Sequence, residues 1–164
     1  MYHEKQQGNY CMKHAINNLI GKELCSNNEF DIYCDELDNI NNFEKGVSKS
    51  KLFYNNGGIN NIFGYVMTKK NMNVEFTYYP YGPTNNGIFN SMETNNLLGF
   101  IVYNKQHTYC VRRIDNRYYL IDSMSHRVVE ITDRVEQYLC RKNLGLIGVY
   151  FLEKSIAKTF RNNS

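Results

Sequence analysis

The sequence predicts one α+β domain in which N-terminal helices pack on an antiparallel sheet. Apolar residues recur at helical spacing through roughly the first seventy residues, and β-branched and aromatic runs broken by Gly, Pro, Asn and Asp follow. The order of helices first and strands afterwards is typical of the α+β class. A chain of 164 residues also suits one domain with its own core. We expect this domain to span residues 1–155, followed by a short polar tail at 156–164.

The first helix is expected at residues 11–20. Its apolar residues share one face, and Gly21 stands where a C-terminal cap belongs. Asn9 is a candidate N-cap just upstream. This prediction places Cys11 in the first turn of a buried helix.

Two further helices are expected before the sheet. The second covers residues 26–37, where Ser26 and Glu29 form a capping-box pattern. The composition then turns to Asn, Gly, Lys and Ser between 39 and 61, which predicts a loop. A third helix is expected at about 59–70. The strands and one more short helix follow, with the strands at 74–79, 99–103, 107–114, 117–122 and 146–152 and the helix at 132–141.

A two-residue turn at Asp115 and Asn116 fixes the register of the third and fourth strands, because both residue types tolerate left-handed backbone. In that register His107 and Asp122 lie on one sheet face as diagonal neighbours. Their backbones are then roughly 7–8 Å apart, which is within side-chain reach. The sequence therefore predicts an imidazole next to a carboxylate.

Composition and charge exclude several classes of function. The formal charge is only +3 and is not clustered, so no basic face for nucleic acid is expected. No apolar run approaches the length needed to cross a bilayer, and the N-terminus lacks the apolar segment of a secretory signal. The five cysteines are odd in number and form no Cys-x-x-Cys pair. We therefore expect free thiols and a reducing location. The expected compartment is the cytoplasm, with the nucleus as a second option.

Cys11, His107 and Asp122 form the candidate catalytic set. A helix N-terminus favours a thiolate, His107 would take the thiol proton, and Asp122 would hold the imidazole ring. The chain order Cys, His, Asp is that of papain-like cysteine proteases. An oxyanion donor is also needed, and Gln6 or Gln7 is suitably placed upstream; the residues alone do not separate the two.

A set of short motifs extends from the N-terminus to residue 123. The motifs are Tyr2-His3-Glu4-Lys5-Gln6, Cys11, His14, Asn17-Asn18-Leu19, Gly99-Phe100-Ile101, Gln106-His107, Cys110-Val111-Arg112 and Tyr118-Tyr119-Leu120-Ile121-Asp122-Ser123. Together they resemble the Josephin family of deubiquitinating cysteine proteases, and the N-terminal motif agrees with that family in identity and spacing at nine or more positions.

The resemblance implies a papain-like fold and hydrolysis of isopeptide bonds after the C-terminal Gly-Gly of ubiquitin. It places nucleophile, base and orienting residue on Cys11, His107 and Asp122, and it selects Gln6 as the oxyanion donor. The Asp form is similar to the shorter Josephin proteins. Two departures bear on substrate preference: the segment 38–58 is short and Asn-rich, and Thr108 follows the histidine where an aromatic residue is usual.

Two other functions remain open on the sequence. The chain could bind ubiquitin with little catalysis, or act as a papain-like hydrolase on a ubiquitin-like modifier. We expect no cofactor and no metal, because no second ligand pair at zinc spacing follows Cys11 and His14. We assign His14 a structural role. The expected partners are ubiquitin or polyubiquitin conjugates, with no nucleic acid and no membrane, and the chain is expected to be a monomer.

Overall fold

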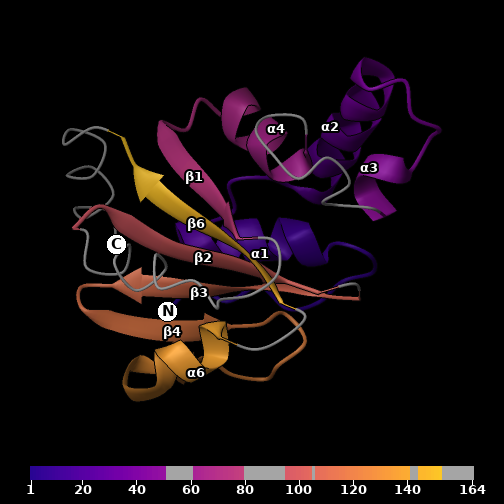
Figure 1. The fold of residues 1–164 in the computed structure, drawn as a ribbon. Helices are drawn as coiled ribbons and strands as arrows, with labels where there is room; N and C mark the ends of the chain where they lie inside the picture. The colour runs from indigo at the N-terminus through magenta and orange to yellow at the C-terminus, as the bar shows by residue number, and fades with distance from the viewer. Residues whose placement is uncertain (51–60, 80–94, 105, 141–143, 153–164) are drawn as a thin grey trace.

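The computed structural model describes residues 1–50, 61–79, 95–104, 106–140 and 144–152. Within these described ranges, four helices come first, and strands with two short helical segments follow (Figure 1). The helical segments are α1 (Cys11–Ile20), α2 (Asn27–Ile40), α3 (Val47–Ser50), α4 (Ile62–Lys69), the 3-10 turn η2 (Thr132–Arg134) and α6 (Val135–Leu139). The strands are β1 (Val74–Tyr79), β2 (Leu97–Tyr103), β3 (Thr108–Ile114), β4 (Arg117–Ile121), β5 (Val129–Glu130) and β6 (Gly145–Phe151).

The strands form one antiparallel sheet in the order β1-β6-β2-β3-β4-β5. The predicted helices-then-sheet architecture is therefore confirmed as α+β. The predicted hairpin is also confirmed, since Ile114 pairs with Arg117 and Cys110 pairs with Ile121. Asp115 has a φ of 55°, so it supplies the left-handed residue that this tight turn needs.

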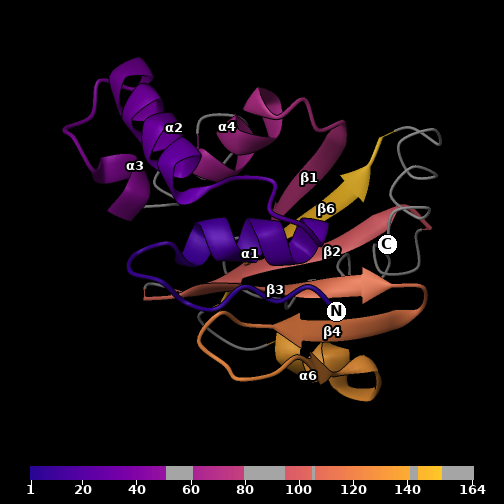
Figure 2. The same cartoon turned by 180° about the vertical axis from the view of Figure 1, so that it is seen from behind.

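Both faces of the sheet are covered. In Figure 2, α1 lies across β2 and β3 on one face, with α2, α3 and α4 grouped above it, while α6 lies behind β4. The two apolar cores match these layers. One joins α1, α2 and α4 to residues such as Ile101, Cys110 and Ile147; the other joins Ile131 and α6 to residues such as Phe100 and Val111. Alternate residues of one strand thus enter different cores, as the pleat requires.

Gly99 allows α1 to approach the sheet closely. A Cβ atom at this position would lie 2.2 Å from the backbone oxygen of Val111 and 2.9 Å from Leu19 Cδ1. Its φ of 147° is also one that other residues rarely adopt. The glycine therefore helps to set the position of the helix that begins at Cys11.

Two of the predicted helix caps are confirmed and one is wrong. Ser26 and Glu29 form the predicted capping box, and Gly21 is the left-handed cap of α1. The expectation that Asn9 caps α1 is wrong, because Tyr10 is the N-cap residue and no side chain bonds to the first turn. The first turn of α1 thus keeps N–H groups without a side-chain cap, immediately beside Cys11.

Other differences concern short or late elements. The second helix runs to Ile40, three residues beyond the predicted end, and the predicted loop contains α3. Strand β5 was not predicted, and the expected helix at 132–141 is divided into η2 and α6. Residues 51–60, residue 141 and the expected tail lie outside the described residues. In the part of the chain that the structure describes, no helix has the length and apolarity to cross a membrane.

Candidate active site

The thiol of Cys11 lies at the start of α1 and is half-buried, whereas the next nine residues of this helix are all buried. The uncapped N–H groups and the helix dipole present positive potential to the sulfur. Tyr10, just before the cysteine, packs edge-on against Phe30 of α2 at 6.2 Å between ring centroids. The fold thus presents the thiol at the boundary between the buried helix and solvent.

His107 and Asp122 meet beyond the end of the β3–β4 hairpin. His107 Nε2 donates a hydrogen bond to Asp122 Oδ1 at 2.6 Å, as the register predicts. The loop before β3 is tied by Asn104, whose side chain accepts the backbone N–H of His107 at 2.9 Å and whose own N–H donates to the His107 carbonyl at 3.0 Å. The ring also stacks on Tyr109 with centroids 6.0 Å apart. Because Nε2 is hydrogen-bonded to Asp122, Nδ1 is the ring nitrogen that can interact with the thiol of Cys11.

Cys11 and His107 shift each other's pKa values toward their charged forms. Burial acts to raise the pKa of Cys11, but hydrogen bonds from His107 and Thr108 and the charge of His107 lower it below its ordinary value. Hydrogen bonds to Asp122 and to Cys11 raise the pKa of His107 to about 9, with burial opposing the shift. Both shifts favour a thiolate beside an imidazolium at neutral pH, and the two groups titrate as a pair.

Asp122 is held in its charged form. Partial burial acts to raise its pKa, but the hydrogen bonds from His107 and from the backbone N–H of Met124 bring the pKa below its usual value. His3 donates from Nε2 to the backbone carbonyl of the same aspartate at 2.7 Å. The orienting carboxylate therefore sits in a segment fixed at both its side chain and its backbone.

The structure separates the two candidate glutamines. The Gln6 side-chain carbonyl accepts the hydroxyl of Ser123 at 2.5 Å, and its amide nitrogen donates to the Gly8 carbonyl at 2.5 Å. Gln7 is exposed, and its side chain contacts Asn27 of α2 at 3.4 Å. Only Gln6 therefore has its amide bonded both to the residue after Asp122 and to the loop that leads into Cys11.

Residues 2–7 form a segment that we call the N-terminal strap. On one side it binds α1: Glu4 pairs with Lys13 at 3.0 Å, His14 at 2.7 Å and the side chain of Asn17 at 2.7 Å. On the other side it binds the turn after β4, where Gln6 N–H donates to the Ser123 carbonyl at 2.8 Å. The strap thus connects the helix that carries the thiol with the turn that carries the carboxylate.

The structure gives His14 the structural role assigned from sequence. The backbone N–H of Gln7 donates to its Nε2 at 3.2 Å, so Nδ1 is the nitrogen that donates to Glu4. Both ring nitrogens are therefore used to hold the strap on α1. Among the described residues, no group of three or more His, Cys, Asp and Glu side chains could hold a metal ion.

The other cysteines divide into two kinds. Cys25, Cys34 and Cys110 are buried packing thiols, and burial raises the pKa of each. Cys140, by contrast, is exposed at the end of α6. Cys140 also has a raised pKa, owing to partial burial and the nearby Glu136. Of the described thiols, Cys11 is the one whose pKa is lowered.

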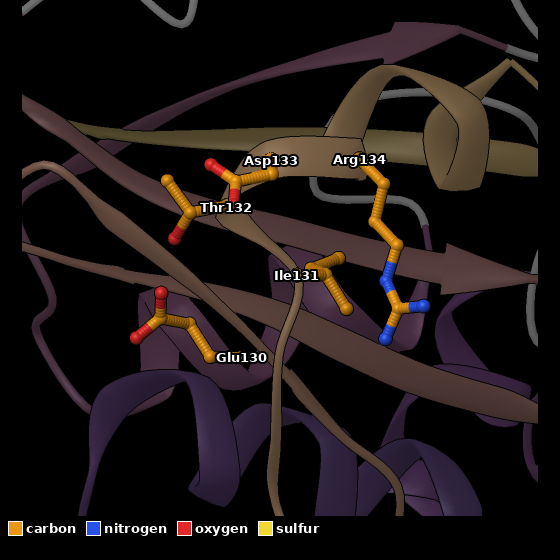
Figure 3. A pocket seen from close by; sticks show the side chains of 5 residues that line it. All are labelled: Glu130, Ile131, Thr132, Asp133 and Arg134. Atoms are coloured by element: carbon orange, nitrogen blue, oxygen red, sulfur yellow. The ribbon is translucent and has the colours of Figure 1, made fainter.

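A hollow of about 330 Å³ lies at the end of β5 and around η2, away from these residues (Figure 3). Its lining is Glu130, Ile131, Thr132, Asp133 and Arg134. Ile131 belongs to the core on the α6 side of the sheet, and the Thr132 hydroxyl is used to accept the backbone N–H of Tyr118 at 3.0 Å. The hollow therefore adds nothing to the arrangement around Cys11.

A thiol at a helix start, an imidazole bonded to a carboxylate and a tethered amide nearby make up the arrangement that cysteine hydrolases use. Comparison with protein families agrees with that class. The family model of Josephin matches residues 6–144, so the chain belongs to the Josephin family of deubiquitinating cysteine peptidases. A search of curated protein sequences gives no match to the chain.

Sequence reasoning missed three contributors to this site: Asn104, Thr108 as a hydrogen-bonding group, and Ser123 as a partner of Gln6. Asn104 carries a weak signal, since Asn side chains often hydrogen-bond the nearby backbone in turns. Ser123 bonds to a residue 117 positions earlier in the chain, and no local pattern indicates such a pair.

Proposed function

We propose that this chain is a cysteine-dependent deubiquitinase that hydrolyses the isopeptide bond after the C-terminal Gly-Gly of ubiquitin. Its nucleophile is Cys11, its acid and base is His107, and Asp122 orients the imidazole. The side chain of Gln6 and the backbone N–H of Cys11 stabilise the oxyanion. The α+β fold is used in the papain-like manner, with the nucleophile at the start of the first helix and the base immediately before strand β3 of the sheet.

The observation that carries the proposal is the pairing of a lowered thiol pKa at Cys11 with a hydrogen-bonded His107 and Asp122 in a member of the Josephin family. An isolated buried cysteine has a raised pKa, as the three packing thiols do. The different behaviour of Cys11 therefore has a specific cause in its neighbours.

The reaction follows from these positions. The thiolate attacks the carbonyl carbon of the last ubiquitin glycine, and the C–N bond to the substrate lysine breaks as the His107 imidazolium donates its proton to the leaving amine. A thioester links ubiquitin to Cys11. Water then attacks the thioester while His107 accepts its proton, which releases the ubiquitin carboxylate and regenerates the thiolate. Two glycines suit such a site because they allow the backbone to approach closely.

The test is labelling with a ubiquitin whose C-terminus carries an electrophile. The wild-type protein should gain the mass of one ubiquitin, and Cys11→Ala should gain none while still binding ubiquitin. Cys140→Ala is the matched control, because it removes an exposed thiol that lies outside the site; it should be labelled as fast as wild type. Labelling of Cys11→Ala at the wild-type rate would overturn the assignment of the nucleophile.

A panel of probes built on ubiquitin-like modifiers, run in parallel, addresses specificity. Reaction with ubiquitin alone supports the proposal, and reaction only with another modifier would replace the substrate while keeping the mechanism. Binding of ubiquitin without any labelling would identify a receptor instead of a hydrolase. Free thiols in a catalytic role also support the proposal of a reducing location, the cytoplasm or nucleus.

A further inference from the structure

Ser123 is the residue immediately after Asp122, and it is buried, with 4% of its surface exposed. Its hydroxyl donates to Gln6 Oε1 at 2.5 Å, and its backbone carbonyl accepts the Gln6 N–H at 2.8 Å. A buried serine thus bonds both the backbone and the side chain of a residue in the N-terminal strap.

Two contacts together determine which way the Gln6 amide points. The Gly8 carbonyl can only accept a hydrogen bond, so the group that faces it at 2.5 Å must be the NH₂ of Gln6. The side-chain oxygen then faces Ser123, whose hydroxyl must act as the donor. The NH₂ group has two N–H bonds, and the Gly8 carbonyl takes one of them. The direction of the second N–H bond is then fixed as well, because the Gln6 amide is held at both its oxygen and its nitrogen.

We propose that Ser123 is a positioning residue that fixes the Gln6 amide as the oxyanion donor. This inference rests on the function proposed above. Consecutive residues after β4 then have complementary tasks: the Asp122 side chain orients the base, and the Ser123 side chain orients the donor. Without the hydroxyl, the Gln6 oxygen loses its partner and the amide can rotate away from the geometry that the transition state needs.

The kinetic signature is specific. The oxyanion exists in the transition state and not in the bound substrate, so Ser123→Ala should lower kcat with KM nearly unchanged. We expect a fall of about 10-fold, smaller than the roughly 10²–10³-fold typical for removal of an oxyanion donor itself. The substrate is ubiquitin with a fluorogenic amine on its C-terminus. Ser125→Ala is the matched control, since Ser125 is exposed two residues further on, and it should have wild-type kcat.

A double-mutant comparison shows whether Ser123 acts through Gln6. If it does, Gln6→Ala combined with Ser123→Ala should be no slower than Gln6→Ala alone. Alkylation of Cys11 by iodoacetamide forms no oxyanion, so its rate should be the same in wild type and Ser123→Ala. Additive losses in the double mutant, or slower alkylation in Ser123→Ala, would overturn the proposal by showing a general distortion of the site.

Because Ser123 is buried, a second pair of variants guards against misfolding. Ser123→Thr and Ser123→Val have nearly equal volume, and only the first keeps the hydroxyl. The threonine variant should exceed the valine variant in kcat by about 10-fold at equal thermal stability, and equal kcat values would contradict the proposal. Failure of the wild-type protein to turn over any ubiquitin substrate would instead contradict the proposed function itself, and with it this role of Ser123.

Discussion

The N-terminal strap and the helical arm formed by α2 and α3 are held to the rest of the molecule in different ways. The strap is fixed by paired charges in a buried setting, where the side chain of Lys13 is 4% exposed and that of Glu4 is 14% exposed. The arm has ion pairs at its surface: Lys49 with Asp31 at 28% and 42% exposure, and Lys70 with Glu29 at 22% and 39%.

This contrast indicates that the position of the strap is more strongly constrained than the position of the arm. Breaking a buried pair leaves an uncompensated charge, which is costly, whereas an exposed pair contributes about 0–1 kcal/mol. The strap side carries the thiol, the carboxylate and the tethered amide. The described part of the arm includes residues 38–50 of the Asn-rich segment that is expected from the sequence to bear on substrate preference. We therefore expect that substrate preference can change in the arm while Cys11, His107 and Asp122 stay in place.

The largest effect should follow from loss of Glu4. Glu4→Ala leaves Lys13 and His14 without their carboxylate, and we expect the free energy of unfolding to fall by about 3–5 kcal/mol. Chemical denaturation at pH 7 measures it. Glu130→Ala is the matched control, because its ion pair with Arg117 is exposed, and it should lose less than about 1 kcal/mol. Equal losses in the two variants would contradict the greater cost expected for breaking the buried pair.

The same carboxylate also predicts a pH dependence. Its hydrogen bonds to His14, Tyr2, Lys13 and Asn17 outweigh burial and lower the pKa of Glu4 from 4.5 to about 2. The stability it adds is therefore present above pH 4.5 and is lost as the pH falls toward 2.

The next effect concerns activity. Asp122→Ala should lower kcat/KM by about 10²-fold, because His107 loses the partner that orients its ring. Asp122→Asn keeps an acceptor but removes the charge, so it should retain more activity and lower the pKa of His107. In wild type, amide hydrolysis should decline as pH rises through about 9, where His107 loses its proton. A pH profile of Asp122→Asn with its alkaline limb unmoved would contradict this role.

The smallest effect is expected in the arm. Lys49 pairs with Asp31 at 2.8 Å and lies 4.0 Å from the ring centroid of Tyr10, the residue before the nucleophile. Lys49→Met should cost no more than about 1 kcal/mol of stability and leave kcat unchanged. Denaturation and steady-state kinetics on one preparation measure both. A fall in kcat comparable to that of Asp122→Asn would mean that the arm and the nucleophile are coupled through Tyr10.

Sequence patterns predicted the parts of this molecule that local rules control. The helical period and Gly21 located α1, the capping box located α2, and the turn residues Asp115 and Asn116 located the hairpin. From that hairpin the contact between His107 and Asp122 followed, because strand register is set by the turn. The papain-like use of these residues and their roles in catalysis remain predictions.

The parts that escaped prediction depend on long-range contacts. Local position does not separate Gln6 from Gln7, so only the family resemblance selects Gln6 in the sequence; in the fold, the side-chain contacts of Gln6 with Ser123 and Gly8 distinguish it. The cap of α1 was misplaced by one residue because Asn9 has a suitable side chain but not the suitable backbone position. Strand β5 has two residues, too few to produce a periodic pattern.

The two-residue turn between β3 and β4 has a consequence for how this chain can change in evolution. Side chains on a strand alternate between faces, so one residue inserted at Asp115 and Asn116 that moved the pairing by one position would turn the base and its carboxylate to opposite faces. The spacing of fifteen residues between His107 and Asp122 is thus constrained in parity as well as in length. Insertions should be tolerated in the loops around this hairpin and selected against at its tip.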